Sequence, residues 1–177
     1  MSSYSEFSDY SDWPDAGFPG IAINPQTLLC EVIDEEACEQ AFQASSDDGE
    51  RVFVLLARGE NNRAAELIAE ARLADPGSLR LRILEADLAR SVHETERAIR
   101  RLRNLVTEYR DSHWESVIRQ HLGKAYFVAG QYQSAASSFS SALNQRVAAG
   151  AEAALIYSST VALQRAREMV ERAESVA

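Results

Sequence analysis

Histidine, cysteine and carboxylate side chains are the groups in this sequence that could catalyse a reaction or bind a metal, and their spacing supports neither role. The histidines are His93, His113 and His121. No two of them lie four residues apart beside a further ligand, the spacing by which one helix face holds zinc. Glycine-rich phosphate-binding motifs and the G-x-S-x-G motif are absent, and no carboxylate pair stands out as an acid and a base. We therefore expect no enzymatic activity, no metal and no cofactor.

The two cysteines, Cys30 and Cys38, are too few for a disulfide scaffold. If both lie on one continuous helix, they are about 12 Å apart along its axis, which is too far for a disulfide. We expect both to be buried thiols.

Acidic charge is concentrated in the first part of the chain. Of the 27 acidic residues, 12 lie in residues 1–50, which contain no lysine or arginine, whereas residues 51–177 carry all 18 basic residues. Like charge repels phosphates, so nucleic-acid binding by the front segment is disfavoured. Two interpretations remain: a solvated, solubilising segment, or an acidic tail that docks on a basic surface of this chain or of a partner.

Neither a membrane span nor a secretory signal is indicated. No stretch approaches about 18 consecutive apolar residues. The first eleven residues contain no basic residue and no apolar block. We expect a cytoplasmic protein that does not contact the membrane.

Residues 1–23 are rich in serine, aspartate and glycine, a composition typical of disorder. Within them Tyr4, Phe7, Tyr10 and Trp13 recur every third residue with acidic residues between them. Such alternation is found in disordered recognition segments. The segment is therefore predicted to be a disordered acidic and aromatic tail, either inert or able to dock.

From Asn24 onward the apolar residues recur at helical spacing, and no run alternates as a strand would. Asn24-Pro25 predicts the start of a helix that extends to Ala44, with Asp34 as an alternative start of a shorter one. Asp47-x-x-Glu50 and Ser112-x-x-Glu115 each have the spacing of a capping box, in which two side chains satisfy the free amides at a helix start. The predicted fold class is all-α.

An internal repeat organises these helices. Its clearest unit, residues 116–149, contains Leu122-Gly123, Tyr126, Gly130, Tyr132, Ala135, Phe139 and Ala142-Leu143. Gly123 and Ala135 are small where two helices of a hairpin must approach, and Gly130 permits a tight turn. Gly59 and Ala64 lie 71 residues before Gly130 and Ala135, which is two periods of about 34 residues plus a three-residue insertion.

The pattern L-G-x2-Y, A-x3-F and A resembles that of the tetratricopeptide repeat. The resemblance implies a right-handed superhelical array of antiparallel helical hairpins in residues 24–177. Its three repeats would span residues 45–78, 79–112 and 116–149, and residues 151–175 would form a capping helix. The middle unit retains few signature residues, but His93 and Ala98 lie 34 residues after Gly59 and Ala64.

In this family the first helix of each hairpin lines a concave groove that binds a peptide. The resemblance therefore implies a non-enzymatic adaptor that binds a protein or peptide partner, with groove residues Arg80, Ile83, Asp87, Arg90, Gln120, Lys124 and Phe127. The lysine and asparagine pair by which some members clamp a terminal carboxylate is not reproduced, since Gln120 and Lys124 stand in those places. Ordinary surface or inter-repeat packing is the alternative role of these side chains.

A second candidate surface comprises Arg97, Arg100, Arg101 and Arg103, which cluster on the polar side of one predicted helix. It is either a solvated face paired with Glu94 and Glu96, or a docking patch for an acidic segment or for phosphates. The second interpretation gives the alternative function, a regulatory nucleic-acid-binding module, which the net charge of −9 disfavours. An apolar stripe left uncovered on the last helix would instead produce a homodimer.

Overall fold

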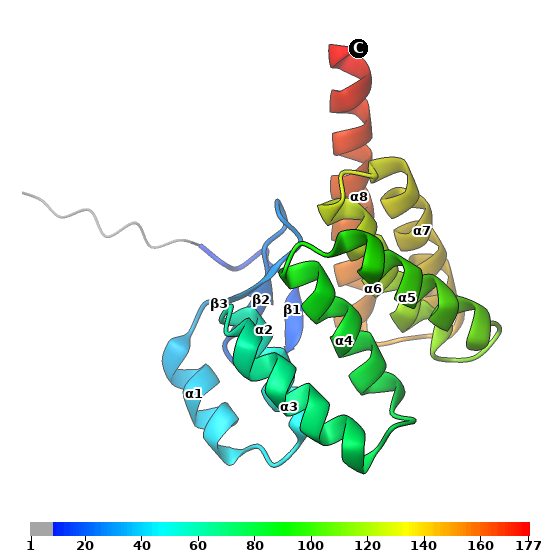
Figure 1. Ribbon diagram of the computed structural model, residues 1–177. Coiled ribbons are helices and arrows are strands. Elements are labelled where there is room, and N and C mark those ends of the chain that lie inside the picture. Colours follow the sequence, from blue (N-terminus) through cyan, green and yellow to red (C-terminus); the bar gives the residue numbers. More distant parts are fainter. Residues whose placement is uncertain (1–8) are drawn as a thin grey trace, which may run out of the picture.

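The computed structural model describes residues 9–177 and consists mostly of helices, with one small antiparallel sheet (Figure 1). The aromatic residues Tyr4 and Phe7 lie outside the described residues. The helices are α1 (Glu35–Ala44), α2 (Asp48–Ala57), α3 (Asn61–Ala74), α4 (Leu79–Ser91), α5 (Thr95–Glu108), α6 (Glu115–Val128), α7 (Tyr132–Ala148) and α8 (Ala153–Val176). Each of the predicted ranges 45–78, 79–112 and 116–149 contains one helix pair, except that α6 begins one residue earlier.

The three pairs turn in the same way. Gly59, His93 and Gly130 have φ angles of 73°, 64° and 74°, in the left-handed region. In each turn the amide of this residue and the amide after it bond back to the end of the first helix, as in a Schellman motif. His93 therefore takes the position that glycine occupies in the other two pairs, 34 residues after Gly59.

Small residues bring the helices of each pair together. Ala64, Ala98 and Ala135 are all fully buried near the start of the second helix. In the third pair, a Cβ added to Gly123 would lie 2.5 Å from the ring of Phe139, which is itself fully buried. Glycine is thus required where α6 crosses the aromatic ring on α7.

The N-terminal region differs from the prediction of a disordered tail and an all-α fold. Strands β1 (Asp15–Phe18), β2 (Ile21–Ile23) and β3 (Cys30–Val32) form an antiparallel sheet in the order β1-β2-β3. In β2 every side chain is buried, so the alternation that marks a half-exposed strand is missing. A three-residue strand buried on both faces gives no periodic signal, and β1 and β3 have only four and three residues, which is why the sequence pattern failed to predict the sheet.

Asn24-Pro25 begins a turn and not a helix. The Asn24 side-chain oxygen accepts hydrogen bonds from the amides of Gln26 and Thr27, at 2.8 and 3.3 Å. This local bonding competes with a helix start, as asparagine often does. The helix begins ten residues later, where the Asp34 carboxylate accepts from the Ala37 amide at 3.0 Å. The alternative start at Asp34 is thus confirmed, and the longer helix from Asn24 is wrong. Cys30 lies half-buried in β3 and Cys38 lies buried in α1, so the two do not share a helix and only Cys38 is the buried thiol expected.

The two predicted capping boxes have different outcomes. Asp47 caps α2 by accepting from the Glu50 amide at 2.8 Å. Ser112 does not cap α6, because its hydroxyl donates to the Tyr109 carbonyl oxygen and the helix begins only at Glu115. The Glu115 carboxylate instead accepts from the amide of Asp111, at 2.8 Å.

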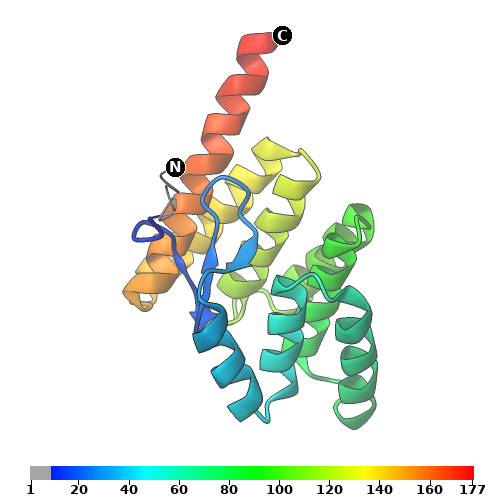
Figure 2. The ribbon, with the colours of Figure 1, turned by 90° about the vertical axis from the view of Figure 1, so that its left-hand side faces the viewer.

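The N-terminal segment connects the first helix pair to the last helix. Phe18 and Ile21 belong to the apolar core between α1, α2, α3 and α4, while Leu28 is buried among side chains of α6, α7 and α8. Tyr157 donates to the Asp12 carbonyl oxygen at 2.8 Å, and Arg165 donates to that of Gln26 at 3.0 Å. In Figure 2 the strands lie between α2 and the lower half of α8. Among the described helices, none is long and apolar enough to cross a membrane.

Candidate functional site

A pocket of about 640 Å³ lies where the first helices of the three pairs face the N-terminal segment. Its walls come from α2, α4 and α6, from the turns at Gly59 and His93, and from residues 27–31 of the segment. Leu29 and Val128 stand at its rim and are 43% and 37% exposed. The pocket is thus reachable from solvent, and it has the size of a site for a small molecule or a short peptide.

A buried carboxylate, Asp87 of α4, organises the polar wall. Its oxygens lie 2.9 and 3.1 Å from Nδ1 of His121 on α6, and one lies 3.4 Å from Arg90. Burial alone would raise the pKa of Asp87, but the charges of His121, Arg90 and Lys124 and the His121 hydrogen bond outweigh it and lower that pKa to about 2. Asp87 therefore carries a negative charge that holds these side chains together.

Positive charge exceeds negative charge on this wall. Lys124 is only 9% exposed, and its ammonium group forms no ion pair with any described residue. The Arg90 side chain is 12% exposed, and its Nε, which is also buried, has no hydrogen-bond partner within residues 9–177. Glu31 of the N-terminal segment also lines the pocket, and its carboxylate accepts from the Asn24 side chain at 3.0 Å. The ammonium group of Lys124, which has no ion pair among the described residues, is thus the group that favours an anion in the pocket.

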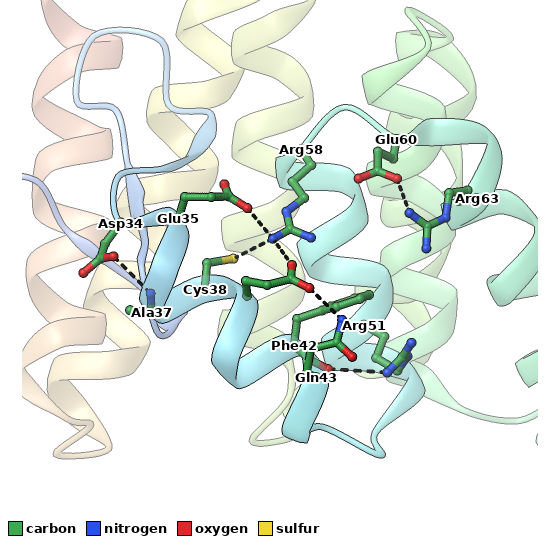
Figure 3. A network of polar contacts seen from close by, with 11 residues as sticks. Asp34, Glu35, Ala37, Cys38, Phe42, Gln43, Arg51, Arg58, Glu60 and Arg63 are labelled. Atoms are coloured by element: carbon green, nitrogen blue, oxygen red, sulfur yellow. Dashed lines mark hydrogen bonds and ion pairs between the residues drawn. The ribbon is translucent and has the colours of Figure 1, made fainter.

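Arg58 closes the other side of the pocket and ties α2 to α1 (Figure 3). Its guanidinium group contacts Glu35 at 2.5 Å and Glu39 at 2.7 Å, and lies 4.0 Å from the sulfur of Cys38. Burial raises the pKa of the Cys38 thiol, so the thiol stays protonated. Because Arg58 already binds two carboxylates, it adds little free positive charge to the pocket.

The remaining wall is apolar. It consists of Leu29 and Cys30 from the N-terminal segment and Phe53, Leu56, Ala57, Phe127 and Val128 from the helices. The rings of Phe127 and Tyr132 meet edge to face, with centroids 5.3 Å apart. This contact and the burial of Phe127 fix the orientation of the Phe127 ring in the apolar wall.

The structure brings together four of the seven predicted groove residues. Asp87, Arg90, Lys124 and Phe127 line the pocket. The other three do not. Arg80 is exposed and pairs with Asp47 at 2.9 Å, and Ile83 belongs to the apolar core around α5.

Gln120, the third of these, lies beneath α8. Its oxygen accepts from Ser159 at 2.8 Å, and Ser159 in turn accepts from Arg146 at 2.7 Å. All three side chains are buried, so this chain of bonds joins α6, α7 and α8 inside the protein. Gln120 is thus unavailable to a partner in the groove.

Sequence reasoning missed His121, Arg58 and the loop residues of the N-terminal segment. His121 lies three residues before Lys124 and therefore on the same side of α6, so it takes the place in the pocket that was predicted for Gln120. Arg58 directly precedes the turn glycine Gly59. Residues 27–31 gave no signal, because they were predicted to belong to a helix that precedes the first repeat.

The arginine cluster of α5 is partly paired. Arg97 contacts Glu94 at 2.8 Å and Arg101 contacts Glu85 at 3.1 Å. Arg100 and Arg103 are exposed and form no ion pair with a described residue. Only half of the predicted patch therefore presents free cations.

Residues 9–177 hold no group of three histidine, cysteine or acidic side chains placed to bind one metal ion. No known protein family matches this chain, and neither a curated protein nor a solved structure matches it.

Proposed function

We propose that this protein is a non-enzymatic interaction module that binds a short segment of a partner protein in the pocket between α2, α4 and α6. The observation that carries the proposal is the pocket itself, in which a wall of buried charged side chains, among them the unpaired Lys124, faces an apolar wall. Peptide-binding sites combine these two elements, because apolar anchors supply affinity and charged groups fix register.

We further propose that the three helix pairs form a superhelical array of the tetratricopeptide type. The equivalent turns at Gly59, His93 and Gly130 support this arrangement, as do the buried alanines five residues after each of them. The contacts of α2 with α4 and of α4 with α6 also support it, since first helices are neighbours in such arrays.

The chemistry of the walls suggests the partner. Lys124 and Arg90 favour an acidic side chain, while Phe53, Phe127 and Val128 favour an aliphatic or aromatic one. Residues 27–31 occupy one side of the concave face, so the space left suits a few residues rather than a long helix. We therefore expect a partner segment in which acidic and bulky apolar residues adjoin.

A selection from a library of displayed random peptides tests this proposal. Selected peptides should bind the full chain, and Val128→Arg should weaken them at least about tenfold by blocking the rim of the pocket. Val147→Arg on α7 is the matched control, because Val147 is also an exposed valine but lies outside the pocket. Failure to select any peptide, or equal binding to both variants, would count against the proposal.

A further inference from the structure

The outer side of the second and third helix pairs carries a groove that the proposed function does not use. A hollow of about 310 Å³ lies between α5, α6 and α7. Its polar lining consists of Arg103 and Thr107 from α5, Arg119 and Tyr126 from α6, and Ser134, Ser137 and Ser138 from α7. We call this hollow the outer groove.

Two guanidinium groups line the outer groove, and each has N–H donors without a partner among the described residues. Arg103 is exposed and has no ion-pair partner among residues 9–177. Arg119 contacts Glu115 only through Nε, at 2.6 Å, so the two terminal nitrogens of its guanidinium group stay available. No carboxylate belongs to the lining.

Hydroxyl groups surround these cations. Ser134 and Ser137 are exposed, whereas Ser138 is only 6% exposed and lies on the floor of the hollow. Thr107 already donates to the Arg103 carbonyl oxygen at 3.2 Å, so the three serines and Tyr126 supply the hydroxyl donors that remain in the lining. Guanidinium forks together with several hydroxyls match the oxygens of a phosphate better than the two of a carboxylate.

The surroundings extend the positive surface. A neighbouring hollow of about 400 Å³ shares Arg103 and Thr107 and adds Arg100, with Glu96 as its one acidic lining residue. Three arginines thus adjoin one another on a protein whose formal net charge is −9. Because the acidic remainder of the chain repels polyanions, a compact phosphate fits this surface better than a long nucleic-acid backbone.

We propose that the outer groove binds a phosphorylated serine or threonine in a segment of a partner protein. Arg103 and Arg119 hold the phosphate, and the serines of α7 donate to its remaining oxygens. Lining residues of this groove and of the concave pocket do not overlap, so the two sites are independent. Failure of one proposal leaves the other standing.

The test is a titration of the isotope-labelled full chain, followed by two-dimensional NMR. The probe is a short phosphoserine peptide, and the comparison peptides carry glutamate or unmodified serine at the same position. We expect saturable shifts of amides in residues 103–107 and 134–138 with the phosphopeptide, and weaker binding of the other two peptides. An equal response to the glutamate peptide, or no saturation, would overturn the proposal.

Two variants on one helix make the test specific. Arg103→Gln should weaken phosphopeptide binding by about tenfold, the loss expected for a charge-assisted hydrogen bond. Arg97→Gln is the matched control, since Arg97 is also exposed on α5 but pairs with Glu94 and lines neither hollow. Equal losses in the two variants would show a response to net charge only. Arginine-dependent binding of a single-stranded oligonucleotide, tighter than that of the phosphopeptide, would contradict the assignment in favour of nucleic acid.

Discussion

Asp87 is a buried carboxylate in contact with groups from two helices, and the polar wall of the concave pocket depends on it. Asp87→Asn should cost about 3 kcal/mol of unfolding free energy, because it leaves Arg90 and Lys124 without their compensating charge. Urea unfolding checks this value. Asp111→Asn is the control and should change little, since Asp111 is exposed and asparagine tolerates its left-handed backbone.

The lowered pKa of Asp87 predicts how the stability of the fold depends on pH. The folded pKa of Asp87 is about 2, below its ordinary value of 3.8, so the unfolded chain takes up this proton first as pH falls. The carboxylate therefore stabilises the fold fully above about pH 5, and this contribution, about 2 kcal/mol, is lost between about pH 4 and pH 2. Urea midpoints of the wild type and Asp87→Asn should converge over that interval. A constant difference across it would contradict this role.

Among the elements, a substitution in one hairpin turn tests whether the three turns share one backbone conformation. His93 has φ of 64° where the other two pairs have glycine. His93→Gly should stabilise the protein by about 0.5–1 kcal/mol, because a non-glycine residue is strained in this region while glycine loses some entropy on folding. Thermal unfolding measures the gain. The control His113→Gly, at a residue without a positive φ, should give no gain.

The loop between β2 and β3 is predicted to hold the N-terminal segment in place. Leu28 is 2% exposed, has φ of 58° and packs among side chains of α6, α7 and α8. Leu28→Ala should therefore cost about 3 kcal/mol, the usual penalty for a cavity in a core. Its neighbour Leu29 is 43% exposed, so Leu29→Ala should cost less than about 1 kcal/mol. Equal effects would mean that the loop does not anchor the segment.

The elements also show what the sequence could and could not predict. Turn glycines and buried alanines reveal the helix pairs, because the turns at Gly59 and Gly130 need a positive φ and the fully buried alanines leave no space for a larger side chain. The sheet stayed hidden, since β2 is three residues long and buried on both faces. Asp87 and His121 are 34 residues apart, so their contact depends on how α4 and α6 pack and no local pattern indicates it.

For the whole molecule, the N-terminal segment is part of the fold. Residues 18–28 supply buried side chains to two of the three apolar cores, and residues 27–31 form one side of the concave pocket. The sequence analysis allows the acidic tail to dock on a basic surface of this chain. Of the described part of the N-terminal segment, the residues that line the pocket come after that tail, in residues 27–31. Deleting residues 9–23 should lower the unfolding temperature. An unchanged unfolding temperature would show that the segment contributes nothing to the stability of the helices.

The proposed binding of a partner segment between α2, α4 and α6 can be mapped residue by residue. The measurement is an NMR titration of the full chain with a peptide from the library selection, followed as chemical-shift changes of the amides. The largest amide shifts should fall in residues 87–93 and 121–128, and Val128→Arg should abolish them while Val147→Arg should not. Shifts confined to the far side of α5 or to the end of α8, with the pocket unchanged, would contradict the proposed binding.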